Sequence, residues 1–150
     1  MTRIDFHTNI ADKVSYACRL SRKALGARGK LVLLADDAEQ AAALDAALWT
    51  LSDTDFLPHV MAGDPLAART PIIVAHAGLF ATPEQAAEPG LPHFDMLVNL
   101  TRATPVLVDR FARVFEIIST DEDDAAAGRK RYVAYKQQHY PLTHFVAGQS

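Results

Sequence analysis

Short runs in which every side chain is apolar constrain the fold of this chain more than any other feature. Leu31–Ala35 is the clearest run, and a strand of this composition needs cover on both faces, as strands of parallel sheets have. Similar runs recur along the chain and predict further strands. The expected strands are Ile4–His7, Leu31–Ala35, Ile72–Ala75, Met96–Leu100 and, as the last one, Phe115–Ile118.

Helical segments separate these runs. Asn9 is expected to cap the first helix, and Asp37 and Gln40 have the spacing of a capping box at the start of the second. The three prolines and two glycines of Gly78–His93 predict a long loop. The expected helices run from Asn9 to about Gly26, from Asp37 to Trp49, over Val106–Arg113, and from a C-terminal start in Asp121–Asp124, where carboxylates complement the helix dipole.

Alternation of strands and helices predicts an α/β fold. We expect a three-layer α/β/α sandwich with a mostly parallel, Rossmann-like central sheet. With 150 residues, 49% of them hydrophobic, the chain fits a single domain that spans residues 1–150.

The composition also limits the functional classes. A net charge of −3 argues against a dedicated nucleic-acid binder, which is usually basic. The single cysteine, Cys18, rules out an intrachain disulfide framework and suits a reducing compartment, where we expect it to act as a small buried hydrophobe. No apolar run approaches the roughly 20 residues that cross a bilayer, and the first residues do not resemble a signal peptide. We therefore expect a cytoplasmic protein without a membrane contact.

No sequence motif of an active site is visible. The chain lacks G-x-G-x-x-G, Walker A, H-E-x-x-H and G-x-S-x-G patterns, and Asp121–Asp124 lacks the ligand spacing of an EF-hand, so a solvated helix start is the simpler interpretation. We expect no catalytic residues, no cofactor and no metal. A rival hypothesis is a doubly wound enzyme for a nucleotide or small metabolite, with its site near Thr8, Asp36 and Ala75–His76 at the carboxyl ends of strands.

Two segments carry side chains that suit protein contacts. Leu44–Gly63 places Trp49, Phe56, Pro58 and His59 in and after a connection, where large apolar groups are either buried in a core or kept for a partner. In the C-terminal helix, Arg129, Tyr132 and Lys136 share one face by their spacing. That face is either an ordinary solvated surface or, with Ile118 as an apolar floor, a pocket for an acidic peptide.

The order of these residues resembles a known family. Leu-Asp-x-Ala-Leu-Trp at 44–49 is followed by Phe-x-Pro-His-x-x-Ala-Gly at 56–63, by Asp95–Leu100, and by Arg131-Tyr132-x-x-Tyr135-Lys136. The set resembles the chi subunit of bacterial DNA polymerase III, an accessory of the clamp loader. The resemblance implies a protein without catalytic activity that joins the psi subunit to the acidic, phenylalanine-ending tail of the single-stranded-DNA-binding protein, and that meets DNA indirectly at most.

The resemblance also assigns residues to each contact. It implies that Trp49 and Phe56, with Pro58 and His59 adjacent, bind psi, or in a bacterium without psi another partner such as a repair helicase. It implies that the tail contacts Ile118, Arg129 and Tyr132. One departure stands out: the lysine that the family often carries one helical turn before the arginine is Ala125 here, and Lys136 or Lys130 is then the compensating cation.

Overall fold

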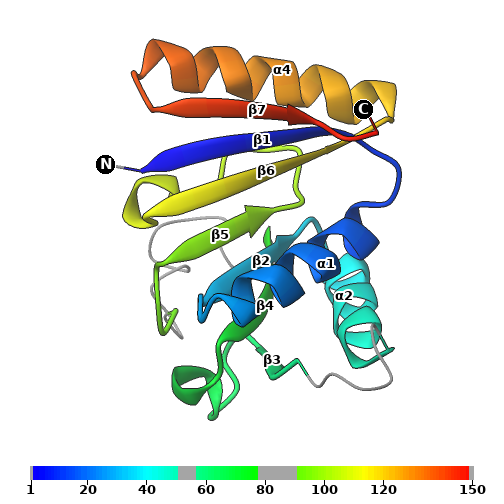
Figure 1. Cartoon of the computed structure of the whole chain (residues 1–150), viewed down its shortest axis with the longest axis vertical. Coiled ribbons are helices and arrows are strands. Elements are labelled where there is room, and N and C mark those ends of the chain that lie inside the picture. The colour runs from blue at the N-terminus through cyan, green and yellow to red at the C-terminus, as the bar shows by residue number, and fades with distance from the viewer. Residues whose placement is uncertain (1, 51–56, 78–90, 149–150) are drawn as a thin grey trace.

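The computed structural model describes residues 2–50, 57–77 and 91–148, which build one parallel sheet (Figure 1). The sheet has seven strands in the order β3-β4-β2-β5-β6-β1-β7, and every pairing is parallel. The strands are β1 (Arg3–Ile10), β2 (Leu31–Ala35), β3 (His59–Met61), β4 (Ile72–His76), β5 (Met96–Asn99), β6 (Arg113–Ser119) and β7 (Leu142–Val146). The α-helices are α1 (Lys13–Gly26), α2 (Ala38–Thr50) and α4 (Glu122–Gln137), and short 3-10 helices cover Ala67–Arg69 and Val108–Arg110.

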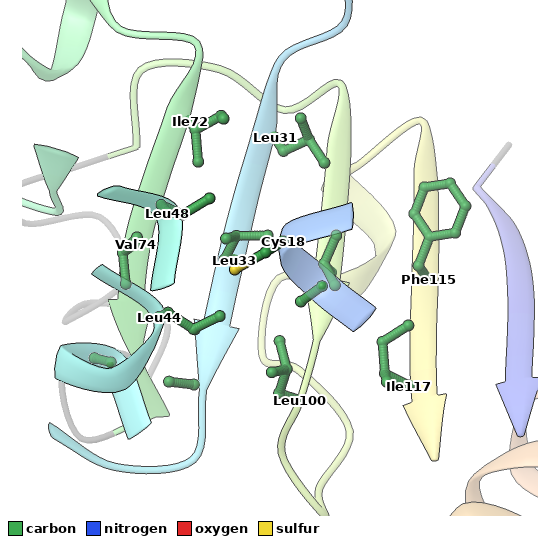
Figure 2. Packing of buried hydrophobic residues seen from close by; sticks show 14 of the residues in the cluster. Cys18, Leu31, Leu33, Leu44, Leu48, Ile72, Val74, Leu100, Phe115 and Ile117 are labelled. Atoms are coloured by element: carbon green, nitrogen blue, oxygen red, sulfur yellow. The ribbon is translucent and has the colours of Figure 1, made fainter. Parts of the chain in front are cut away.

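Two cores lie on the two faces of the sheet. Helices α1 and α2 cover one face, where Cys18 and Leu44 pack against Leu33 and Val74 (Figure 2). Helix α4 covers the other face, where Tyr135 packs with Phe6. Side chains of successive strand residues point to opposite faces, which explains why all five residues of β2 are buried. The α/β sandwich with a parallel sheet is confirmed.

The five predicted strands are present, and two further strands extend the sheet at its edges. The short β3 pairs with β4, and β7 pairs with β1, so Phe115–Ile118 does not lie in the last strand. The sequence of β7 gave little signal because its three central residues are exposed, whereas the apolar runs mark strands with two covered faces. Edge strands therefore escape a search for buried runs.

Three predicted boundaries are wrong. Asn9 does not cap a helix, because β1 continues to Ile10 and Asp12 is the cap, its carboxylate accepting from the Ser15 amide at 3.1 Å. The helix expected over Val106–Arg113 is reduced to a single 3-10 turn, because Arg113 already pairs with both neighbouring strands in β6. Strand β5 ends at Asn99 rather than Leu100.

Other predictions of local structure agree with the described residues. The capping box exists in a shifted form: Asp37 accepts from the Gln40 amide at 2.8 Å, and Gln40 Oε1 accepts from the Asp36 amide at 2.8 Å. Of the loop predicted over Gly78–His93, residues 78–90 lie outside the described residues, and the last three have neither helix nor strand. Cys18 is free and fully buried. Among the described residues, no helix is long and apolar enough to span a membrane.

Candidate functional site

An open groove of about 610 Å³ runs between α4 and the carboxyl ends of β1 and β6. We call this site the α4 groove, and its lining includes Ile118, Ala125, Gly128, Arg129, Tyr132 and His144. The structure thus brings Ile118 of β6 together with Arg129 and Tyr132 of α4. Lys136 is exposed one helical turn beyond Tyr132 and does not line the groove.

The groove floor depends on a close approach of α4 to β6. Ile118 is only 3% exposed, and a Cβ placed on Gly128 would lie 2.7 Å from its Cδ1 and 3.1 Å from both Cγ1 and Cγ2. Only glycine therefore lets the helix backbone rest on this isoleucine. The glycine costs helix propensity, about 1 kcal/mol relative to alanine, and its position indicates that close packing of α4 outweighs that cost.

Aromatic rings form one end of the groove. The half-buried Tyr132 meets Phe6 edge-to-face, with ring centroids 5.0 Å apart. Across the groove, the His144 ring lies 6.2 Å from Tyr132, and its Nε2 is 2.8 Å from the Thr8 hydroxyl. Tyr132 and His144 thus form two walls of the groove, and each is fixed by a contact with a residue of β1. The space between them is bordered by these rings and by the apolar floor at Ile118.

The charge of the groove comes mainly from Arg129. Its side chain is exposed and has no ion-pair partner within the described part of the chain. The half-buried Ala125, one helical turn before Arg129, also lines the groove and adds apolar surface instead of charge. An unpaired guanidinium beside an apolar floor suits a carboxylate attached to a hydrophobic group.

The start of α4 is anchored from within the protein. Asp121 caps the helix by accepting from the Asp124 amide at 3.0 Å, which confirms the predicted helix start. Asp124 itself is buried, not solvated as expected, and it accepts from the Ser119 amide at 2.7 Å and pairs with Lys13 Nζ at 2.9 Å. Burial raises the pKa of Asp124, but the bonds from Ser119 and Lys13 outweigh burial, and the net pKa is lowered.

The middle of α4 is tied to β6 by a buried polar cluster. The fully buried Glu116 accepts from Arg131 Nη2 at 3.1 Å and from the Tyr135 hydroxyl at 2.7 Å. Asn99 donates to the same carboxylate at 2.9 Å. Burial raises the pKa of Glu116 and outweighs the lowering by these donors. Because Arg131 and Tyr135 alternate with Arg129 and Tyr132 along the helix, this cluster sets which side of α4 faces the groove.

The second predicted site lies at the opposite edge of the sheet, beside β3 (Figure 1). Trp49 in the last turn of α2 is 57% exposed, and its ring centroid is 4.9 Å from that of His59, at 64°. We call Trp49, Pro58 and His59 the Trp49 surface. Phe56 lies outside the described residues.

His59 is buried and packs against the ring of Trp49 instead of facing solvent. It is only 7% exposed; its Nδ1 donates to the Leu57 carbonyl at 2.7 Å, and its Nε2 lies 3.0 Å from Asp45 Oδ1. Pro58 is half-buried. A partner on this surface would therefore contact mainly the Trp49 ring, whose orientation is held by the imidazole.

The residues of the rival enzyme hypothesis are spread along the carboxyl edge of the sheet. Thr8 lines the α4 groove, whereas the half-buried His76 ends β4 on the far side of β2. Within the described ranges, no group of three His, Cys, Asp or Glu side chains could hold a metal ion.

Three features of the α4 groove were not predicted. Gly128 and His144 belong to the lining, and the Lys13–Asp124 pair anchors the helix start. A glycine in the interior of a helix was the available signal for a close approach. The position of His144 had no signal, because the strand that carries it was not predicted.

Comparison with known proteins places the chain among replication proteins. A family model described as "DNA polymerase III chi subunit, HolC" matches residues 1–143. A DNA polymerase III subunit chi from Pseudomonas aeruginosa is 32% identical over 146 residues, 95% of this chain and 94% of the relative. The subunit chi of Haemophilus influenzae is 27% identical over 85% of this chain and 82% of its own, and that of Escherichia coli is 28% identical over 72% and 68%.

Proposed function

Because the chain belongs to the DNA polymerase III chi subunit family, we propose that it acts as a non-catalytic connector in DNA replication. One contact is made with the clamp-loader complex, through the psi subunit or an equivalent protein. The other contact is made with the acidic C-terminal tail of single-stranded-DNA-binding protein. The separation of the α4 groove and the Trp49 surface to opposite edges of the sheet carries this proposal, because both partners can then bind at once.

The α4 groove is the proposed tail site. Arg129 holds the terminal carboxylate, while the phenylalanine ring of the tail lies over Ile118 between Tyr132 and His144. A guanidinium fork can bind both carboxylate oxygens, and hydrogen bonds to charged groups contribute about 1.5–3 kcal/mol each. The acidic residues before the phenylalanine add attraction that salt screens.

A fluorescent peptide with an acidic sequence and a C-terminal phenylalanine tests this site by anisotropy. We expect micromolar binding that weakens by about tenfold or more in Arg129→Ala, which follows from the charged hydrogen bonds lost. Arg129→Lys should recover only part of the affinity that Arg129→Ala loses, because a lysine lacks the planar fork of a guanidinium group. The same peptide with an amidated C-terminus should bind the unaltered protein as weakly as the acid peptide binds Arg129→Ala.

Trp49→Ala is the matched control, since it lies at the other edge of the sheet and should leave peptide binding unchanged. Equal binding by Arg129→Ala and the unaltered protein would overturn the tail assignment. Equal binding of the acid and amidated peptides would overturn the carboxylate role of Arg129.

The Trp49 surface is the proposed clamp-loader contact. An exposed tryptophan is the side-chain type most often found at the centre of protein interfaces, and the His59 ring holds it in one orientation. Trp49 is the single tryptophan of the chain, so its emission reports directly on this surface. Adding purified psi subunit, itself freed of tryptophan by substitution, should shift the emission to shorter wavelength.

The tail peptide should leave the tryptophan emission where it is, which separates the two sites in one assay. In a pull-down from the source cell, Trp49→Ala should lose its clamp-loader partner and keep single-stranded-DNA-binding protein. If psi leaves the emission unchanged and Trp49→Ala retains the same partners as the unaltered protein, the assignment of this surface is wrong.

A further inference from the structure

The net charge of −3 conceals a strong segregation of charge. Residues 1–30 contain seven lysines or arginines and two aspartates, whereas residues 31–150 contain eight basic and sixteen acidic residues. The basic segment folds into β1 and α1. Helix α1 lies over the middle of the sheet and packs against Phe115 and Ile117 of β6, whereas no described helix lies in front of β1 and β7 on the same side (Figure 1). The positive charge therefore collects next to an open sheet surface.

Aromatic rings cross this open surface. His7 of β1 is in register with Phe145 of β7, and their ring centroids are 5.5 Å apart. The His7 ring also lies 5.5 Å from that of Tyr16 on α1 and 5.6 Å from that of Phe115 on β6. Phe145 is 53% exposed. The exposed ring therefore offers a face on which a flat partner group can stack.

Arginine side chains border the rings in fixed positions. Arg113 Nε lies 2.6 Å from Asp5 Oδ2, and its guanidinium carbon lies 4.5 Å from the centroid of Phe115. Arg3 Nε shares the same carboxylate at 3.1 Å. Asp5 is buried, while the side chains of Arg3 and Arg113 remain 53% and 42% exposed. One carboxylate thus orients two guanidinium groups and leaves a net positive charge facing solvent.

Helix α1 adds two more cations. Tyr16, Arg19 and Lys23 share one helix face by their spacing, and the guanidinium of Arg19 lies 5.9 Å from the Tyr16 centroid. Burial lowers the pKa of His7; the charge of Asp5 raises this pKa, but the charges of Arg113 and Lys23 lower it again, and the net pKa is lowered. We call this surface the β1–α1 face: Arg3, His7, Arg19, Lys23, Arg113 and Phe145.

We propose that the β1–α1 face binds single-stranded nucleic acid without sequence preference. Cations at its border contact the phosphates, and bases stack on the exposed Phe145 beside the half-buried ring of His7. Sheet surfaces and grooves that combine exposed aromatic rings with arginines bind single strands in this way. The rings favour a nucleic acid over an acidic peptide, because every nucleotide supplies both a phosphate and a flat base.

The face is separate from the α4 groove. Side chains along a strand alternate between the two sides of the sheet, so Arg3, Asp5 and His7 face α1, whereas Phe6 and Thr8 face α4. A bound tail and a bound strand would therefore not compete. If the proposed tail contact holds the protein beside coated DNA, even a weak contact becomes effective, since tethering gives millimolar local concentrations.

Anisotropy of a fluorescein-labelled thymidine 15-mer, titrated at several salt concentrations, tests the proposal. We expect weak binding at low salt, with a negative slope of log affinity against log salt. Each phosphate contact contributes about 0.7 to the slope for a single strand, so Arg19→Ala/Lys23→Ala should reduce its magnitude by about 1.4. Phe145→Leu keeps an apolar side chain but removes the ring, and it should weaken binding by about fivefold or more.

Arg69→Ala/Arg110→Ala is the matched control, because it removes the same charge from exposed positions outside the face. It should bind the oligonucleotide almost as the unaltered protein does, and the melting temperature of every variant checks that it is folded. The proposal is overturned if no binding occurs at low salt, or if the two double variants lose affinity equally. It is also overturned if an abasic 15-mer binds as tightly as the thymidine one, which would make the face a site for polyanions in general. Tail-peptide binding should remain unchanged in all of these variants, so failure here leaves the tail assignment intact.

Discussion

Gly128→Ala sets two effects of opposite sign against each other at the floor of the α4 groove. An alanine in a helix interior is worth about 1 kcal/mol more than a glycine. At this position, however, its Cβ would meet three atoms of Ile118 at 2.7–3.1 Å. Overpacking of a core costs about 1–3 kcal/mol, and the β-branched Ile118 has few alternative rotamers. We therefore expect a net loss of up to about 2 kcal/mol in the free energy of unfolding.

The effect on the site should accompany the effect on stability. Relief of the clash requires α4 to move away from β6 or Ile118 to move into the groove, and either change disturbs the surface under the proposed phenylalanine of the tail. Urea unfolding measures the first effect, and anisotropy of the tail peptide measures the second. We expect peptide affinity to fall by several-fold although no side chain that touches the peptide has been removed.

Two further variants make the reasoning specific. Gly26→Ala at the end of α1 is the control, because its Cβ would meet nothing within 4 Å, so the protein should keep or gain stability. Ile118→Val removes Cδ1, the atom at 2.7 Å, and the double variant Gly128→Ala/Ile118→Val should be more stable than the sum of the single changes predicts, by about 0.5 kcal/mol or more. If Gly128→Ala stabilises the protein as Gly26→Ala does and leaves peptide affinity unchanged, Gly128 is not needed for the contact between α4 and Ile118.

Three other predictions concern buried ionisable groups. Glu116→Gln should lower the free energy of unfolding by about 3–5 kcal/mol, because Arg131 stays buried without a counter-charge; a loss below about 1 kcal/mol in urea unfolding would contradict an ionised pair. The lowered pKa of Asp124 contributes stability that is present above its unfolded pKa of about 3.9 and is lost as the pH falls through its folded value. Asp124→Asn, measured by urea unfolding at pH 6 and pH 3, should therefore show a smaller loss on acidification than the unaltered protein, and an equal loss would refute the assignment. Burial raises the pKa of Cys18 to about 11, so a thiol reagent at pH 8 should modify it only after urea unfolds the chain, and rapid modification of the native protein would refute its burial.

Local sequence patterns predicted the parts of this fold that are buried on both sides. The apolar runs at Leu31–Ala35 and Ile72–Ala75 became central strands, because a strand with two covered faces must be apolar throughout. Edge strand β7 was missed for the opposite reason: its exposed residues carry no such constraint. The helix boundary at Asn9 failed because both Asn9 and Asp12 can cap a helix, and pairing of β1 with β6 decided between them.

The residues of the two proposed contacts could be found by spacing and resemblance, but their roles depend on tertiary structure. Spacing put Arg129, Tyr132 and Lys136 on one helix face, yet only Arg129 and Tyr132 line the groove. The groove lies at the carboxyl end of β6, and the last turn of α4, which carries Lys136, lies beyond it. In the same way, His59 was grouped with Trp49, while the fold made it the buried support of an exposed ring.

By itself, the sequence determined the fold class, the family and the side chains available for binding. Patterns of burial, helix capping and residue order involve residues that are close together in the chain, so they can be recognised without the tertiary structure. Tertiary structure alone decided how far α4 approaches β6, that Asp124 and Glu116 are buried with partners, and that His144 faces Tyr132 across a groove. These contacts join residues up to more than a hundred positions apart. Their geometry follows from the order of strands in the sheet, which no short segment of the chain specifies.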